Sequence, residues 1–486
     1  MDYQQLLLAL LPDLLVVVAL FAALGVDYSR LRGSRLAKRY QMACRISAAG
    51  LIAGLAVLLL QIAGTMTVME STADGQLVLT RGTLTLQALL YAMGLGVLPL
   101  ATRDQVTPQV SEYFALLLLA TLGMGFVVSS RNLLGAFVAL ELVSLSLYAM
   151  TVLNQAKRAS AEAALKYLTF GAVASGFLLF GLSYLYGATG QLDLTQMTDL
   201  QHSPLLVLAY LLIFVGLGFK LALAPFHLWA PDVYQNAPTP VAGWVGSGSK
   251  IAAAALLVTL LQPVFTSPEL KAELIPALAA LAVASMVVGN LGALRQTNLK
   301  RLLAYSAIAN AGYLLVGVVA FSAVGNTSVI FYILVYSLAS LGAFGVVAVL
   351  TDTLGRDAEI SDFNGCWKTT PGLAIAFLVF VLSLAGIPPL AGFLGKFYLF
   401  FAAIGAAPEA AAWHDGFYWL VAFALIMSVV SLYYYLRVLR AFLVVPADDE
   451  VPVKTGWAAG ITLCVLAIAV LALGLWPEPL LTLLRH

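Results

Sequence analysis

Several ionisable residues lie inside long apolar stretches of the sequence, where charged side chains are rare. They are Glu141, Lys166, Lys220, Lys250 and Lys396. A charged group in an apolar environment is costly, so such residues indicate functional sites. Burial disfavours the charged form of an amine, and a nearby carboxylate favours it. A buried lysine that approaches and then leaves a glutamate can therefore bind and release a proton.

The composition indicates that these residues lie in a membrane. Of the 486 residues, 62% are hydrophobic and 10% are charged, and the mean hydropathy is +0.96. Soluble domains carry about 25% charged residues. Apolar runs of about 20 residues recur along the chain, as in membrane-spanning helices and unlike the shorter strands of a barrel. We predict an all-α polytopic membrane protein that has lipid, and no nucleic acid, as a partner.

Dividing the sequence at its charged, Gly/Pro-rich and polar clusters predicts about fourteen transmembrane helices. They lie near residues 4–26, 42–63, 84–101, 111–130, 132–153, 161–187, 204–227, 238–262, 274–294, 300–321, 327–351, 372–402, 417–443 and 456–476. The first is followed, not preceded, by the basic cluster from Arg30 to Arg39, so we expect it to be retained and not cleaved as a signal peptide. Most basic residues outside the spans fall on one side, which the positive-inside rule places in the cytoplasm, with both termini outside.

Distance from the span ends bears on whether the lysines are buried. Lys220 and Lys250 each lie about ten or more residues from either end of their spans, or roughly 15 Å at 1.5 Å per residue. A snorkelling lysine does not reach that far. Lys166 and Lys396 lie nearer to a span end, so snorkelling stays an alternative for these two. We interpret Glu141 as buried.

Prolines interrupt two of the predicted spans close to lysines. Pro225 follows Lys220 in the seventh span, and Pro388 and Pro389 precede Lys396 in the twelfth. Proline removes a backbone donor and opens a helix. Broken backbone at membrane depth persists only where protein encloses it or where it lines a hydrated cavity. We therefore expect the lysines to face polar partners or water.

The two broken helices occupy matching places in the chain. We predict helices 1–3 over residues 1–110, a five-helix repeat over 111–263, a second over 264–445, and the last helix within 446–486. The seventh and twelfth helices are each fourth in their repeat. An odd number of helices inverts the second copy, as in transporters whose broken helices form the site.

Three segments carry a resemblance to a known family. They are "FKLALAPFHLWAPDVYQNAPTPVAGWVGSGSK", "NLKRLLAYSAIANAGYLL" and "SLAGIPPLAGFLGKFYLF". These segments look like the signatures of the antiporter-like membrane subunits of respiratory complex I, the proton-pumping NADH:quinone oxidoreductase. The resemblance covers nearly the whole chain and is closest to subunit N. The length argues against the longer subunit L, and subunit M usually has a glutamate where this chain has Lys396.

The resemblance implies which residues act and what surrounds the chain. It implies roles in proton translocation for Glu141, Lys166, Lys220, His227, Lys250 and Lys396. It also implies that this chain binds no cofactor, that FMN and iron–sulfur clusters lie in other subunits, and that the neighbours are M-like, K-like and L-like subunits, the last with its lateral helix. The expected location is the bacterial inner membrane. In one departure, Asn310 stands where many relatives have a histidine, and an amide carries no charge near neutral pH.

Other functions and motifs were compared with the sequence: an antiporter subunit, a structural scaffold, a phosphate loop and a metal site. An Mrp-type cation/proton antiporter subunit shares these motifs, so that function stays open beside the complex I function. A purely structural scaffold does not explain the lysines. The segment "GWVGSGSK" lacks the Gly-Lys-Ser/Thr order and the preceding strand of a phosphate loop, so its small residues predict close helix packing. Three widely spaced cysteines do not form a metal motif.

Overall fold

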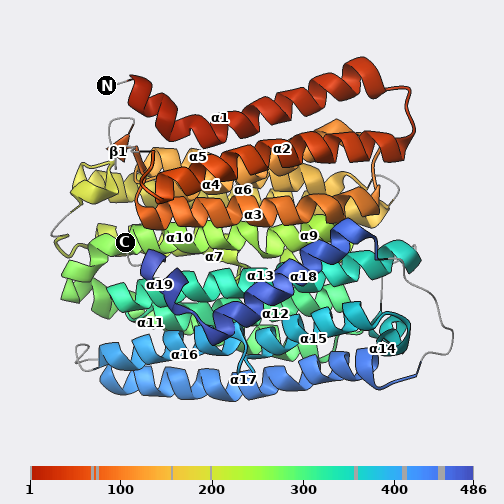
Figure 1. The fold of residues 1–486 in the computed structure, drawn as a ribbon. Coiled ribbons are helices and arrows are strands. Elements are labelled where there is room, and N and C mark those ends of the chain that lie inside the picture. Colours follow the sequence, from red (N-terminus) through yellow and green to blue (C-terminus); the bar gives the residue numbers. More distant parts are fainter. Residues whose placement is uncertain are drawn as a thin grey trace.

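The chain folds as a bundle of membrane-length helices (Figure 1). The computed structural model describes residues 3–66, 71–72, 76–154, 157–197, 200–354, 359–407, 413–446 and 455–484. Within these ranges the one sheet is a hairpin of two-residue strands, β1 (Ser71–Thr72) and β2 (Leu77–Val78). The predicted all-α class is confirmed.

The first helices precede the first predicted repeat. They are α1 (Tyr3–Val26), which continues as a π-helical turn to Leu31, α2 (Leu36–Ile62) and α3 (Arg81–Asp104). The helices of the first predicted repeat are α4 (Val110–Ser129), α5 (Leu133–Val152), α6 (Arg158–Thr189), α7 (Pro204–Leu221), α8 (Ala230–Asn236), α9 (Thr239–Gly246) and α10 (Gly248–Leu261).

The remaining helices belong to the second predicted repeat and to the C-terminal segment. They are α11 (Pro268–Leu294), α12 (Leu299–Val318), α13 (Ala323–Leu354), α14 (Cys366–Thr369), α15 (Pro371–Ala385), α16 (Ala391–Ala406), α17 (His414–Leu443), α18 (Trp457–Leu475) and α19 (Glu478–Leu484). The boundaries between the repeats, near residues 110, 263 and 445, stay predictions.

The number of membrane crossings agrees with the sequence. Among the described residues, 13 helical segments are long and apolar enough to cross a membrane. The twelfth predicted span, 372–402, is divided into α15 and α16, as its prolines predict, and each of these helices is shorter than the 13 segments. Counted together as one crossing, the pair brings the number of crossings to fourteen, and the chain is an integral, multi-pass membrane protein.

Three crossings are interrupted, one more than the sequence predicts. The seventh stops at Leu221, where Ala222 takes a left-handed conformation, and helix resumes at Ala230. The twelfth stops at Ala385 and resumes at Ala391. The unpredicted interruption is in the eighth crossing at Ser247, with φ −124° and ψ −81°. Glycines flank Ser247 on both sides, and glycine weakens a helix at this place.

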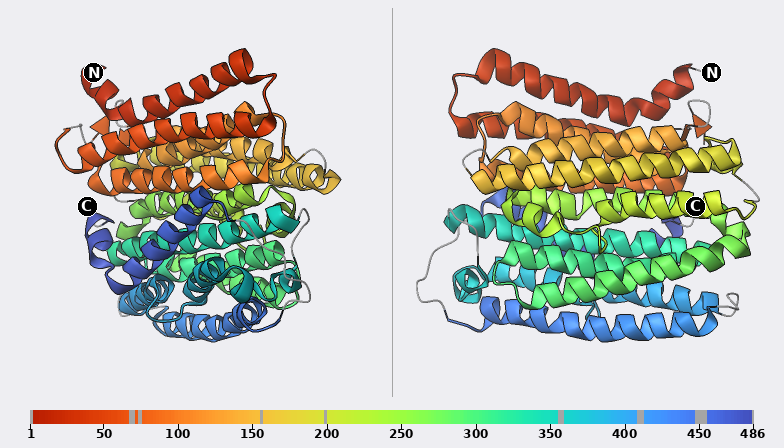
Figure 2. Two further views of the ribbon diagram at one scale, coloured as in Figure 1. Left: turned by 45° about the vertical axis from the view of Figure 1, so that its right-hand side comes forward. Right: turned by 180° about the vertical axis from the view of Figure 1, so that it is seen from behind.

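The helices follow one another across the bundle in approximate sequence order, from α1 to α17 (Figures 1 and 2). α18 departs from this order and returns over α13, α15 and α16. The most apolar stretch of α13 is 100% buried, against 22% for α18, so α13 forms the centre. The start of α1 and the end of α19 lie at the same end of the bundle, as an even number of crossings requires.

The interruption in the twelfth crossing depends on a glycine at the start of α16. A Cβ atom at Gly392 would lie 1.8 Å from the Ser383 carbonyl oxygen of α15. Gly392→Ala is therefore expected to destabilise this region by about 1–3 kcal/mol, the usual cost of overpacking. The matched control is Gly405→Ala in the same helix, where a Cβ meets nothing within 4 Å. The thermal unfolding midpoint of the purified assembly checks this, and equal midpoints for both variants would contradict it.

Candidate functional site

Lys396 is held by the backbone that two prolines leave open. Its side chain is 5% exposed, and its Nζ lies 3.3 Å from the Leu384 carbonyl oxygen and 3.2 Å from that of Ala385. In a continuous helix these carbonyls would accept from the N–H groups of residues 388 and 389. Both positions are proline and have no N–H. The interruption therefore supplies two carbonyl acceptors to a buried amine.

The amine of Lys396 has two further contacts. It donates to the Ser428 hydroxyl of α17 over 3.1 Å and lies 4.7 Å from the centre of the Tyr313 ring. Gly386, with φ +82°, closes the end of α15 next to the lysine side chain. The C-terminal end of a helix is electronegative, so it stabilises the charged amine.

Lys220 has different partners from those of Lys396. It lies in the last turn of α7, and its amine donates to the hydroxyls of Ser144 and Tyr148 on α5. The rings of Tyr148 and Phe219 lie 5.5 Å and 5.4 Å from Nζ, within the range of cation–π attraction. The interruption before Pro225 thus ends the helix beside Lys220, but side chains of α5 hold the amine.

Glu141 lies one turn before Ser144 on α5. It is half-buried, whereas the sequence analysis predicts that it is buried. Its carboxylate accepts from the Ser175 hydroxyl of α6 over 2.6 Å. Glu141 and Lys220 interact electrostatically. In this structure, however, the Glu141 carboxylate and the Lys220 amine are each hydrogen-bonded to hydroxyl groups and not to each other. Ser144, which accepts from Lys220, in turn donates to the Leu140 carbonyl oxygen, next in the chain to Glu141.

Lys250 lies at the start of α10, directly after the interruption at Ser247. It is 1% exposed. Its Nζ donates to the Ala307 carbonyl oxygen of α12 over 3.0 Å and lies 5.6 Å from the centre of the Tyr336 ring. The buried position beyond the reach of snorkelling, predicted from the sequence, is confirmed.

Asn310 joins three helices between Lys250 and Lys396. Its Oδ1 accepts from the Tyr332 hydroxyl of α13 over 2.8 Å, and its Nδ2 lies 3.3 Å from the Tyr435 hydroxyl of α17. The same Nδ2 donates to the Ser306 carbonyl oxygen over 2.8 Å, and the hydroxyls of Ser306 and Tyr435 are hydrogen-bonded. The amide thus satisfies its donors and acceptors with neutral groups.

Asn290 on α11 has a similar arrangement that includes Tyr313, the tyrosine beside Lys396. Its Oδ1 accepts from the Tyr434 hydroxyl over 3.2 Å, and its Nδ2 donates to the Tyr313 hydroxyl over 3.2 Å. Tyr313 also bonds Ser431, one turn after Ser428 on α17. Each asparagine therefore holds two tyrosines from different helices.

Lys166 is at the surface of this chain, whereas Lys220 is half-buried and Lys250 and Lys396 are buried. Its side chain is 40% exposed, and its amine pairs with Glu162 over 2.8 Å and with Asp232 of α8 over 2.9 Å. Asp232 also accepts from Arg301 over 2.7 Å. Asp232 thus accepts hydrogen bonds from two cationic side chains, Lys166 and Arg301. Asp232 is thus an anionic link that fastens α8 to α6 and α12.

His227 lies in the segment between α7 and α8 and is half-buried. Its Nδ1 is enclosed, with no hydrogen-bond partner among the described residues. Enclosed polar atoms of this kind are usually satisfied by ordered water. The histidine therefore has a place where it could bind water beside the interrupted seventh helix.

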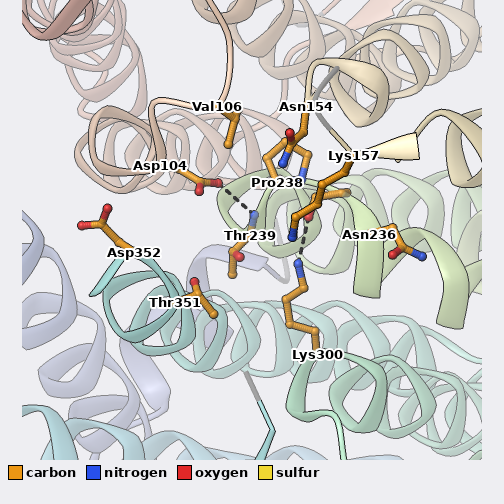
Figure 3. Close-up of a pocket in the computed structure, with 11 residues that line it drawn as sticks. Asp104, Val106, Asn154, Lys157, Asn236, Pro238, Thr239, Lys300, Thr351 and Asp352 are labelled. Atoms are coloured by element: carbon orange, nitrogen blue, oxygen red, sulfur yellow. Dashed lines mark hydrogen bonds between the residues drawn. The ribbon is translucent and has the colours of Figure 1, made fainter. Parts of the chain in front are cut away.

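A polar pocket of about 270 Å³ opens near the start of α9, at the end of the bundle that carries the α1–α2 turn. Figure 3 shows Asp104 and Lys300 reaching toward the turn before Thr239. Asp104 Oδ2 accepts from the Thr239 N–H over 3.1 Å, and the Lys300 amine donates to the Ala237 carbonyl oxygen over 2.9 Å. These contacts fix the start of α9, whose far end leads to Lys250.

The comparisons with known proteins agree with this arrangement. The family model described as "NADH:quinone oxidoreductase/Mrp antiporter, TM" matches residues 130–431. NADH-quinone oxidoreductase subunit N 2 of Acidobacterium capsulatum is 45% identical, over 100% of this chain and 99% of the relative. The chain belongs to the NADH-quinone oxidoreductase subunit N family. Subunit N of Hirschia baltica is 44% identical over 70% of this chain and 69% of the relative.

Solved structures resemble this subunit N family member over almost its full length. A chain of respiratory complex I from Thermus thermophilus with bound aureothin has a TM-score of 0.80 and 36% identity, covering 98% of this chain and 100% of that one. A chain of the Mrp complex from Dietzia sp. DQ12-45-1b has a TM-score of 0.81 with 23% identity, covering 100% and 97%. The second likeness shows the shared fold alone.

Sequence reasoning missed most side chains that surround the lysines in this subunit N family member. A tyrosine in an apolar helix is usually interpreted as a residue of the hydrophobic core. The missed residues, all in apolar helices, are Ser144, Tyr148, Asn290, Tyr313, Tyr332 and Tyr435. The run "YYYLR" at 433–437 is the clearest missed signal, since adjacent tyrosines in an apolar helix need hydroxyl partners when buried. Within the described ranges, no group of three or more His, Cys, Asp or Glu side chains is placed to hold a metal ion.

Proposed function

We propose that this chain is a proton-translocating membrane-arm subunit of NADH:quinone oxidoreductase in a bacterial inner membrane. NADH oxidation and quinone reduction then take place in other subunits, which carry the FMN and iron–sulfur clusters, and M-like, K-like and L-like subunits are the neighbours. The observation that carries this proposal is the pairing of Lys396 with the two carbonyls that Pro388 and Pro389 leave open. A fixed structural cation would not need a helix interrupted at membrane depth.

The proposed route uses Glu141, Lys220, Lys250 and Lys396, in this order across the bundle. α7 contacts α10, α10 contacts α13, and α12 and α13 contact α16, so the lysines form a series that runs across the helices. Each amine is held by neutral acceptors or aromatic rings. The neutral acceptors around Lys250 and Lys396 let each amine exist with or without its extra proton, whereas at Lys220 the nearby Glu141 carboxylate favours the charged form.

An Mrp-type antiporter subunit is the second candidate function, favoured by the likeness in fold to the Mrp chain. Purification of the natural complex through a tag on this chain tests the two functions. The complex I proposal expects FMN and iron–sulfur clusters to copurify with NADH oxidation activity. Copurification with small membrane subunits alone, without flavin, would contradict it.

Lys166 and Lys220 are expected to respond differently to arginine. Arginine keeps the charge but does not lose its proton near neutral pH. Lys166→Arg preserves the ion pair with Asp232 and should retain most proton uptake, whereas Lys220→Arg should lower it at least about tenfold, as expected for a proton-transfer group. NADH-driven proton uptake by vesicles measures both. If Lys166→Arg is as inactive as Lys220→Arg, Lys166 must itself release a proton, as the family resemblance implies.

A further inference from the structure

Two pockets share a wall beside α19, at the end of the bundle opposite the α1–α2 turn. Four residues line both pockets, at the end of α10, near the start of α13 and at the end of α19: Gln262, Asn326, Thr327 and Leu484. The positive-inside rule places this end of the bundle on the outer side of the membrane. We call the two pockets together the outer groove.

One half of the outer groove is polar. It has a volume of about 280 Å³ and reaches from the start of α3 to the end of α10. Arg131 is the one charged side chain among the described residues that line it. The other polar side chains of this lining carry neutral hydroxyl or amide groups: Thr80, Thr83, Thr259, Gln262, Asn326 and Thr327. An anion in this half would therefore meet a cation and neutral hydrogen-bond donors.

Arg131 lies between α4 and α5, and its protein contacts use only part of its guanidinium group. Its Nη1 donates to the carbonyl oxygens of Val128 over 3.2 Å and of Ser130 over 3.0 Å, at the end of α4. Its Nε and Nη2 have no hydrogen-bond partner among the described residues, and no carboxylate of these residues pairs with it. A guanidinium group stays charged near neutral pH and binds phosphate through two donors at once. Arg131 therefore has donors available for an anion.

The other half of the outer groove is apolar and opens on the surface of the chain. It has a volume of about 580 Å³, and α13 and α16 form much of its wall. Phe397 and Phe401 line it and are 50% and 61% exposed. They lie nine and five residues before the end of α16, or roughly 14 and 8 Å from that end at 1.5 Å per residue. The groove thus continues from the polar outer end of the bundle to the depth of the hydrocarbon.

We propose that the outer groove binds one phospholipid of the outer leaflet, with its phosphate on Arg131 and an acyl chain along Phe397 and Phe401. A phospholipid joins a phosphate and acyl chains in one molecule, and so matches the charged and the apolar half together. The described lining of both halves contains no Asp or Glu. An anionic lipid such as phosphatidylglycerol is therefore favoured over a zwitterionic one, whose cation would have no carboxylate to pair with. This inference concerns lipid binding and does not depend on proton translocation.

The bound lipid would connect the two predicted repeats. Arg131 follows α4 in the first repeat, whereas Phe397 and Phe401 belong to α16 in the second. Between them lies the wall that the two halves share, with Asn326 and Thr327 of α13. A ligand that binds only the folded protein stabilises it, so we expect the lipid to stabilise the chain.

Lipid retention by the purified natural complex tests the proposal. The complex is washed with detergent, incubated with phosphatidylglycerol and passed through a sizing column, and the retained lipid is counted by mass spectrometry. Arg131→Gln is expected to retain one phosphatidylglycerol fewer than the parent. It should need at least about tenfold more lipid to recover it, as expected for loss of hydrogen bonds to a charged group.

The matched control is Arg81→Gln, because Arg81 is exposed at the start of α3 and lines neither pocket. This variant should retain as much phosphatidylglycerol as the parent. Equal retention by Arg131→Gln and Arg81→Gln would overturn the proposal, and Arg131 would then only cap the end of α4.

Ala323→Trp tests the apolar half without a change of charge. Ala323 is exposed at the start of α13 and lines this half, so an indole ring there would occupy the space of the acyl chain. This variant is also expected to lose the retained phosphatidylglycerol. Retention at the parental level would show that no acyl chain lies in the groove, and the proposal would be wrong.

Inorganic phosphate separates a phospholipid site from a simple anion site. Added phosphatidylglycerol should raise the thermal unfolding midpoint of the parental complex, and this rise should be absent in Arg131→Gln. Inorganic phosphate at the same concentration should not raise the midpoint, because it lacks an acyl chain. An equal rise with inorganic phosphate would contradict the proposal. None of these measurements records proton uptake, so their failure would leave the proposed function standing.

Discussion

Vesicles containing Lys396→Arg are expected to lose NADH-driven proton uptake by about 100-fold, within the range for loss of a proton-transfer group. All three hydrogen-bond partners of Lys396 are acceptors: two carbonyl oxygens and the Ser428 hydroxyl. Arginine has five N–H donors and no practical neutral form. It would satisfy these acceptors and remain charged, so the position could no longer release a proton.

Glutamate at the same position should be less damaging than arginine or alanine. A carboxyl group reverses the charge, but it titrates, and its protonated form can donate to one of the two open carbonyls. We therefore expect Lys396→Glu to retain more proton uptake than Lys396→Arg or Lys396→Ala. The measurement is the initial rate of proton uptake divided by the amount of assembled complex. Full uptake in Lys396→Arg would show that the residue is a fixed charge.

The sequence predicts the framework of this site because the framework follows from local rules. Helix length, proline and the positive-inside rule predict about fourteen crossings and the interruptions of the seventh and twelfth, and the structure confirms these and adds a third interruption at Ser247. Helical hydrogen bonds join residues four apart, and Pro388 and Pro389 have no N–H. The sequence therefore also predicts that the Leu384 and Ala385 carbonyls have no helical donor. The group that donates to these carbonyls depends on how α15 and α16 pack, so only the structure shows that it is the Lys396 amine.

The rest of the site depends on contacts between distant segments. Asn290 and Tyr434 are 144 residues apart, and Asn310 and Tyr435 are 125 apart. No local pattern brings such pairs together. The interruption at Ser247 was missed because serine and glycine lower helix propensity only slightly, unlike proline. Lys166 was predicted near a span end, and only the structure shows that its partner is Asp232.

Lys220→Ala and Glu141→Ala are expected to lower proton uptake and quinone reduction together, each at least about tenfold for loss of a proton-transfer group. Lys220 and Glu141 interact electrostatically, and coupled steps do not turn over separately. Electron transfer to a soluble artificial acceptor should continue, because the proposed redox centres lie in other subunits. Lys368→Ala is the matched control, since Lys368 is exposed on α14, outside the spans.

The most direct test of proton carriage by the buried lysines is one measurement on Lys220→Ala vesicles. Proton uptake is recorded from the same sample while NADH is oxidised, first with quinone and then with the artificial acceptor. We predict that uptake and quinone reduction fall by the same factor, while the rate with the artificial acceptor equals that of Lys368→Ala. Parental rates of both proton uptake and quinone reduction in Lys220→Ala would contradict the account, because the lysine would then carry no proton.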